Sequence, residues 1–388
     1  MTVNLALLDP FTLASQFPTV QDKQFDWGPM TALSFNESGD YLAAGLEDGE
    51  ILIIDVDSWY PVCSFLGHSS AINTLCWSTD SKLLVSGSND FHVIVWETQT
   101  HLPVHRFLIG GPATHVTINP GTSNSLVVTR LGGALIYIDL QTKRKITIPE
   151  PANSTTCKFL HDQTFIVGDS KGSIFAFRDC GNGTVDPLGS QKVATGGILV
   201  LGSADNRLII TSLDRAIYVV TATLSTDFQV NVQLKIQNKM ERIQWRNTVL
   251  SSNGDLIITV PENEPMKIII WDEDGHIVHA YECPEPIRSL VFNPVRTLMV
   301  ATGSSSGAAY VWSREFTEKW GVFAANFSDI VENQVYYEKE TDFDIMSETP
   351  DGIKLWPEDR VVDIQTKEFN TVTPIPYMVR SSVPNGNT

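Results

Sequence analysis

The sequence has little of what marks secreted, membrane or metal-binding proteins. Its five cysteines are odd in number, lie far apart and never form a Cys-x-x-Cys pair, which argues against a disulfide framework and a structural zinc site. No apolar run reaches the roughly 18 residues that span a bilayer, and Asp9 follows Leu7-Leu8 where a signal peptide would carry a basic and then an apolar stretch. These absences predict a soluble, intracellular protein without a membrane partner.

Positive charge is also scarce. The 388 residues include 27 lysines and arginines against 45 aspartates and glutamates, so the formal net charge is −18. This charge argues against a primary nucleic-acid binder, because phosphate affinity comes mostly from clustered basic groups. With 42% apolar residues, a chain of this length has enough material to bury one large all-β domain.

The motifs of catalysis are missing as well. There is no glycine-rich phosphate loop, no His-Glu-x-x-His and no cluster of metal ligands. His276 and His279 lie three residues apart on an expected outer strand, but no third ligand accompanies them. We therefore expect no enzymatic activity, cofactor, metal or small-molecule ligand.

What the sequence does contain is a repeat. Short β-type runs recur about every 40–45 residues, the period of WD-type propeller repeats, and their penultimate residues are Ile54, Trp96, Ile138, Phe177, Val220, Trp271 and Trp312. Each run follows a turn signal such as Asp48-Gly49. The pattern predicts a seven-bladed β-propeller over residues 26–325, with an insertion around 223–240 where the spacing is longer.

A propeller must cover the edge between its first and last blades, because exposed strand edges invite aggregation. Residues 1–25 are expected to do this, with the apolar segment Asn4–Leu8 pairing as a strand with the last blade. A docked coil is the alternative for that segment.

The second repeat carries His68, Ser86, Asp90 and Trp96 at the spacing of the WD-repeat hydrogen-bonded tetrad. The same histidine, serine and aspartate could be taken for a hydrolase triad. A structural network is the better interpretation, since nothing nearby supplies an oxyanion hole.

The C-terminal segment 326–388 has a different composition. Between Asp329 and Asp363 it has eleven acidic residues against three basic ones, with large apolar groups interspersed and no periodic apolar face. Such a segment does not bury its own aromatic side chains, so it is expected to be an extended, largely unstructured interaction tail.

Residues 320–344, WGVFAANFSDIVENQVYYEKETDFD, closely resemble the segment that follows the propeller in the retinoblastoma-binding protein five family, called Swd one in fungi. The opening LLDPF, the CWSTDSKLLVSGSND of the second repeat and the FNPV of the seventh resemble it too. The family is the WD-repeat scaffold of COMPASS-type complexes, chromatin regulators that methylate lysine four of histone three. The resemblance implies a non-catalytic nuclear scaffold that takes part in transcription regulation.

The resemblance also implies partners and their contact residues. Activation of a SET methyltransferase domain would use Phe327, Glu332, Asn333 and Tyr336. Binding of the SPRY domain of an Ash-two/Bre-two subunit would use Glu338, Glu340, Asp342, Phe343 and Asp344. Binding of a second, small WD-repeat subunit would use Val362, Asp363 and Ile364, and nucleosome contact would use Arg215 and Arg242. The alternative function is a generic WD-repeat adaptor, such as a ubiquitin-ligase substrate receptor, because the fold alone does not specify function.

Overall fold

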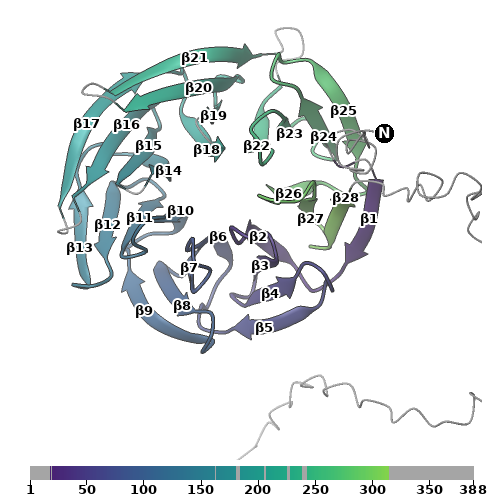
Figure 1. Cartoon of the computed structure of the whole chain (residues 1–388), viewed down its shortest axis with the longest axis horizontal. Coiled ribbons are helices and arrows are strands. Elements are labelled where there is room, and N and C mark those ends of the chain that lie inside the picture. Colours follow the sequence, from purple (N-terminus) through teal and green to yellow (C-terminus); the bar gives the residue numbers. More distant parts are fainter. Residues whose placement is uncertain are drawn as a thin grey trace, which may run out of the picture. The chain divides into compact units, whose positions relative to one another are not determined.

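The computed structural model describes residue 18 and residues 20–161, 163–180, 184–204, 207–224, 228–237 and 243–313. In this part of the chain every regular element is a β-strand, and the strands form seven four-stranded antiparallel sheets. Figure 1 shows these sheets arranged as blades around a central axis. The predicted all-β, seven-bladed propeller is confirmed. No helix in the described residues is long and apolar enough to cross a membrane.

Each blade runs from an innermost strand to an outermost one. Blades 1 and 2 comprise β2 (Met30–Phe35), β3 (Tyr41–Leu46), β4 (Ile51–Asp55), β5 (Pro61–Phe65), and β6 (Ile72–Trp77), β7 (Leu83–Ser88), β8 (His92–Glu97), β9 (Leu102–Leu108). Blades 3 and 4 comprise β10 (Ala113–Ile118), β11 (Ser125–Arg130), β12 (Leu135–Asp139), β13 (Arg144–Ile148), and β14 (Ser154–His161), β15 (Thr164–Asp169), β16 (Ser173–Asp179), β17 (Val185–Lys192).

Blades 5 and 6 comprise β18 (Ile198–Ala204), β19 (Arg207–Ser212), β20 (Ile217–Leu224), β21 (Phe228–Ile236), and β22 (Trp245–Leu250), β23 (Ile257–Pro261), β24 (Lys267–Trp271), β25 (Ile277–Glu282). Blade 7 comprises β26 (Ile287–Phe292), β27 (Met299–Gly303), β28 (Ala309–Ser313) and β1 (Val20–Phe25).

The core lies between neighbouring blades rather than inside any one of them. Second and third strands such as β11 and β12 are buried along almost their whole length, which explains their continuous apolar sequences. Outermost strands such as β1 and β25 are mostly exposed and read as polar or mixed. The buried side chains form seven clusters, each shared by two adjacent blades, so every blade is stabilised by both neighbours.

The innermost strands are joined by a repeated feature at one end of the ring. In all seven blades the pairing of the first and second strands has a register shift after its first residue. In several blades a side chain at or beside this bulge donates to a carbonyl of the next blade: Thr31 to Ile72 (2.5 Å), Asn73 to Ala113 (2.9 Å), Thr114 to Thr155 (3.1 Å) and Asn247 to Arg288 (2.9 Å). The bulges therefore connect neighbouring blades across the ring.

The strand that closes the ring is Val20–Phe25. It pairs antiparallel with β28, from Val20 opposite Ser313 to Phe25 opposite Ala309. This strand belongs to the segment 1–25 that was expected to close the ring, whereas Asn4–Leu8, which was expected to supply the closing strand, lies outside the described residues. The predicted boundary at 325/326 also lies outside them and stays a prediction.

The extra residues between the fifth and sixth blades are largely regular structure. β20 and β21, with eight and nine residues, pair from Ile217 opposite Ile236 to Leu224 opposite Phe228. The predicted insertion at 223–240 is therefore mostly the lengthened outer hairpin of blade 5.

Candidate interaction face

One end of the ring carries the loops that lead into each innermost strand and the turns between each second and third strand. The register fixes this arrangement, because the first residue of an innermost strand pairs with the last residues of the second, as Ile72 pairs with Ser88. We call this end the turn face. The arginine that the sequence proposes for nucleosome contact, Arg215, lies here in the turn between β19 and β20 and is exposed.

Arg246 and Arg288 lie at the same end, and sequence reasoning missed them. They are the second residues of β22 and β26, at the bulges of blades 6 and 7. Within the described part of the chain, the guanidinium groups of Arg215, Arg246 and Arg288 have no recorded ion pair. The signal shared by Arg246 and Arg288 is their position, because each innermost strand places its second residue at a bulge on the turn face.

The backbone at Arg215 is held by a polar network. Arg215 has φ 67°, a left-handed conformation that costs a non-glycine residue about 1 kcal/mol. The neighbouring Asp214 carboxylate accepts hydrogen bonds from the hydroxyl groups of Tyr218 (2.6 Å) and Thr195 (3.0 Å) and from the Thr195 amide (3.1 Å). Burial raises the pKa of Asp214, but these hydrogen bonds outweigh it and keep the pKa below its usual value. The network fixes the turn that presents Arg215.

Blade 2 contains a hydrogen-bonded chain of four side chains. His68 Nδ1 lies 2.9 Å from Asp90 Oδ2 and His68 Nε2 lies 2.7 Å from Ser86 Oγ, which accepts the Trp96 indole N–H at 2.8 Å. Burial lowers the pKa of His68, which favours a neutral ring that donates to Asp90 and accepts from Ser86. With its hydrogen bonds satisfied internally, this group stabilises the blade.

Other blades replace this chain with different residues. In blade 7, Glu285 accepts from the amides of Ser305 (3.1 Å) and Ser306 (2.8 Å) and from the Tyr310 hydroxyl (2.8 Å). Tyr310 lies opposite Ala301, as Tyr218 lies opposite Ile210 in blade 5. In blade 5 the tyrosine on the third strand reaches Asp214, which lies in the turn between the second and third strands as Asp90 does in blade 2. In blade 7 the tyrosine reaches Glu285, which lies in the loop before the innermost strand.

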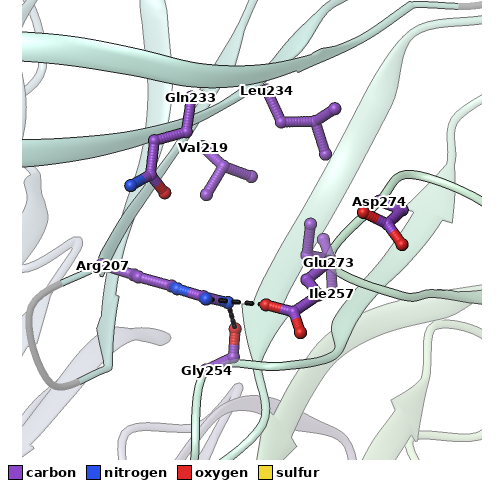
Figure 2. Close-up of a pocket in the computed structure, with 8 residues that line it drawn as sticks. All are labelled: Arg207, Val219, Gln233, Leu234, Gly254, Ile257, Glu273 and Asp274. Atoms are coloured by element: carbon purple, nitrogen blue, oxygen red, sulfur yellow. Dashed lines mark hydrogen bonds and ion pairs between the residues drawn. The ribbon is translucent and has the colours of Figure 1, made fainter.

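A small cavity of about 240 Å³ lies between blades 5 and 6, away from the turn face (Figure 2). Arg207 crosses it and donates to Glu273 (2.7 Å) and to the carbonyl of Gly254 (3.3 Å). Asp255 and Asp274 add further negative charge. Because the single cation is already neutralised, the arrangement serves to link two blades and does not suit an anionic ligand.

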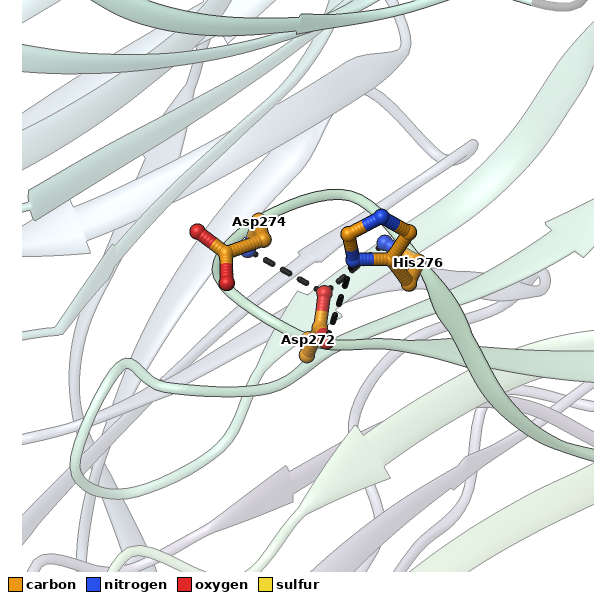
Figure 3. A group of neighbouring side chains, drawn as sticks. All are labelled: Asp272, Asp274 and His276. Carbon is orange, nitrogen blue, oxygen red and sulfur yellow. Dashed lines mark hydrogen bonds and ion pairs between the residues drawn. The ribbon is translucent and has the colours of Figure 1, made fainter.

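Asp272, Asp274 and His276 form a cluster of candidate metal ligands (Figure 3). Asp272 Oδ1 accepts the amides of Asp274 (3.1 Å) and His276 (2.8 Å), which closes the turn between β24 and β25. These main-chain hydrogen bonds, that of His276 first, lower the pKa of Asp272. The geometry is that of a hairpin turn, and His279 lies further along β25, outside the cluster.

The tail residues proposed for partner binding lie outside the described residues, as does Arg242, and their roles stay predictions. They are Phe327, Glu332, Asn333, Tyr336, Glu338, Glu340, Asp342, Phe343, Asp344, Val362, Asp363 and Ile364.

The seven four-stranded blades and the His68–Trp96 network define a WD-repeat β-propeller protein. The family model "WD domain, G-beta repeat" matches residues 59–97, which include that network.

Comparison with curated proteins confirms the predicted resemblance to the Swd one and retinoblastoma-binding protein five family. The "Set1 complex component swd1" of Schizosaccharomyces pombe is 27% identical, over 89% of this chain and 91% of that protein. The "Retinoblastoma-binding protein 5 homolog" of Drosophila melanogaster is 26% identical, over 89% of this chain and 73% of that protein. Among solved structures, the Cps50 (Swd1) β-propeller domain of Myceliophteria thermophila has a TM-score of 0.71 at 22% identity, covering 76% of this chain and 99% of that one, and this supports the fold.

Proposed function

We propose that this chain is a non-catalytic scaffold subunit of a nuclear COMPASS-type complex that methylates lysine four of histone three. The observation that carries the proposal is the extent of the similarity. A generic WD-repeat adaptor would share mainly the repeats, whereas the Set1 complex component of Schizosaccharomyces pombe matches 89% of this chain, more than residues 26–325 alone contribute.

The tail is proposed to bridge the partners. All seven sheets are complete within residues 20–313, so no sheet requires a strand from the tail. Residues 327–336 would contact the SET domain, residues 338–344 the SPRY subunit, and residues 362–364 the second WD-repeat subunit. The acidic and aromatic composition of 338–344 suits a basic, partly apolar pocket, because charge-assisted hydrogen bonds and ring burial then act together.

The proposed mechanism is a population shift. The tail binds the active arrangement of the SET domain better than the inactive one, and the difference in affinity sets the degree of activation. A synthetic peptide covering 326–345 should then raise methylation of histone three by the SET and SPRY subunits. Phe327→Ala and Tyr336→Ala should lower kcat more than they raise KM for the histone peptide. If the peptide does not activate at saturating concentration while the full chain does, the propeller makes the activating contacts, and their assignment to the tail is wrong.

The turn face is proposed to contact nucleosomal DNA through Arg215, Arg246 and Arg288. Arg242, which lies outside the described residues, is proposed to contribute to the same contact. Three of these arginines are described, and no ion pair within the described residues neutralises their charge. A few well-placed arginines provide a salt-sensitive contact to phosphate even on an acidic protein.

Partner identification tests the function as a whole. The tagged full-length chain should co-purify from nuclear extract with a SET-domain protein, a SPRY-domain protein and a second WD-repeat protein. Recovery of a cullin or its adaptor in their place would support the alternative function as a ubiquitin-ligase substrate receptor and contradict this proposal.

A further inference from the structure

Phe91 occupies a position where the turn geometry favours glycine. It lies in the turn between β7 and β8 with φ 68°, and its side chain is 45% exposed. The corresponding turn residues in blades 1, 4 and 7 are glycines with φ between 75° and 93°, namely Gly49, Gly172 and Gly307. A side chain in this conformation costs about 1 kcal/mol relative to glycine. In blade 5 the corresponding residue is Arg215, with φ 67°, so this turn also accepts an exposed side chain there. A large exposed ring gives the turn no stability of its own, and it therefore points to a function.

Phe91 belongs to a group of exposed apolar side chains on the turn face. Leu108 is 59% exposed, and Leu66 and Leu131 are each 71% exposed. Main-chain hydrogen bonds tie their segments together: Ile109 donates to the Phe91 carbonyl (2.9 Å), and Leu131 donates to the Pro112 carbonyl (3.0 Å). We call Leu66, Phe91, Leu108 and Leu131 the Phe91 patch. Its position over blades 2 and 3 separates it in the ring from the arginines of blades 5 to 7.

The loop that carries Leu66 is held against the same turn. The amide of Ser69 donates to Asp90 Oδ2 at 3.1 Å, and His68 binds the same carboxylate. The buried tetrad thus also positions two apolar side chains of the patch, Leu66 in the loop and Phe91 in the turn.

Three basic side chains surround the end of β9 within this patch. Lys145 Nζ donates to the carbonyl of Leu108 (2.8 Å), and Arg130 Nη1 donates to the carbonyl of Ile109 (2.9 Å). Arg106 projects from β9 itself, half exposed, with its guanidinium 3.9 Å from Asp90. Lys145 and Arg130 donate to neutral carbonyl groups, so these hydrogen bonds do not neutralise their positive charge. In a chain of net charge −18, this is a local concentration of positive charge beside an apolar surface.

We propose that the Phe91 patch binds an acidic peptide segment of a partner protein that carries at least one aromatic or long aliphatic side chain. The carboxylates would pair with Lys145, Arg106 and Arg130, and the apolar side chain would pack on Phe91 and the three leucines. A nucleic acid fits less well, because four exposed apolar side chains give nothing to a phosphate backbone. The proposal does not depend on the tail or on the proposed complex.

The test uses the full-length chain and three probes. One is a fluorescent 12-residue peptide in which leucine and phenylalanine alternate with aspartate and glutamate. The second replaces each acid with lysine, and the third is a 20-base-pair DNA duplex. The acidic peptide should bind, more weakly as salt rises, and the basic peptide should not.

Phe91→Gly and two matched pairs of variants locate the site. Phe91→Gly should weaken binding of the acidic peptide about 10-fold, because it removes a partly buried ring, while the melting temperature stays equal or rises. Leu108→Ser should also weaken binding, whereas Leu102→Ser, at the other end of β9 and 63% exposed, should not. Lys145→Gln should reduce both affinity and salt dependence, and Lys171→Gln, on the turn face in blade 4, should change neither.

Several results would overturn the proposal. These are no binding of the acidic peptide at millimolar concentration, equal binding of the basic peptide, or binding that Phe91→Gly and Phe91→Asn leave unchanged. DNA binding that is lost with Lys145→Gln but not with Phe91→Gly would assign the surface to nucleic acid instead. If the chain failed to co-purify with methyltransferase subunits, the proposed function would be contradicted, but the peptide-binding result would be unaffected.

Discussion

Removing one buried hydroxyl should reveal how strongly the blade 2 tetrad is coupled. Ser86 is fully buried and its Oγ joins Trp96 to His68. Ser86→Ala leaves both the indole N–H and the imidazole Nε2 without a partner. An unsatisfied buried group costs about 1–3 kcal/mol, so with two such groups the free energy of unfolding should fall by about 2–6 kcal/mol.

Blade 6 supplies a matched comparison. There Trp271 donates to Thr259 Oγ1 at 2.9 Å, and no histidine among the described residues bonds to that hydroxyl. Thr259→Val preserves shape and leaves a single donor unpaired, which should cost about 1–3 kcal/mol. Ser64→Ala, on exposed outer strand β5, should change stability by less than about 0.5 kcal/mol.

Urea unfolding of the full chain measures the free energies, and hydrogen exchange of the β7 and β8 amides shows whether the loss is local. We expect Ser86→Ala to lower the free energy of unfolding by at least about 1 kcal/mol more than Thr259→Val does. In Ser86→Ala, hydrogen exchange should accelerate first in blade 2. Equal costs for the two variants would mean that His68 and Asp90 contribute nothing through Ser86, and the argument for a coupled network would fail.

Burial lowers the pKa of His115 to about 4, so the unfolded chain takes up this proton first as pH falls below about 6.5. The part of the free energy of unfolding that depends on this proton is fully present above about pH 6.5 and is lost progressively as pH falls to about 4. By about pH 5 the free energy of unfolding should have fallen by about 2 kcal/mol. In a His115→Gln variant, the free energy of unfolding should therefore depend less on pH over this range. Arg246→Ala with Arg288→Ala should weaken nucleosome binding and reduce its salt dependence, while melting stays unchanged; a salt dependence equal to that of the natural chain would refute the proposed contact. Val362→Glu with Ile364→Glu should weaken binding of the second WD-repeat subunit by at least about 100-fold, and calorimetry showing full affinity would remove these residues from the interface.

The repeats were predictable because their signals are local. A buried third strand such as β8 must be continuously apolar, and the turn before it needs residues that tolerate left-handed backbone. Both conditions appear within a dozen residues, so the number of blades follows from spacing alone.

The closing strand was not predictable in the same way. β1 reads VQDKQF and is exposed along nearly all its length, so it lacks the apolar pattern that identified the other strands. Its pairing depends on main-chain hydrogen bonds to β28, close to the other end of the described chain. The apolar Asn4–Leu8 was the stronger local signal, yet β1 occupies the edge.

The polar networks of blades 5 and 7 were missed for a related reason. Asp214 and Glu285 are held by tyrosines and by serine or threonine groups that match no WD consensus. Their partners become neighbours only when the strands of one blade pair with each other. The same holds for Arg246 and Arg288, whose position depends on a bulge that recurs in space but has no fixed residue type.

Closing the ring with β1 has a consequence for synthesis of the chain. β1 leaves the ribosome among the first segments of the domain, and β28, its sheet neighbour among the described strands, among the last. For most of translation the first blade has no seventh blade to pack against, and β1 has no strand to join. A nascent propeller is thus an open arc with unpaired edges, prone to pairing with another copy. Slowing translation just before Ala309 should lengthen the life of that arc and increase its demand for chaperones.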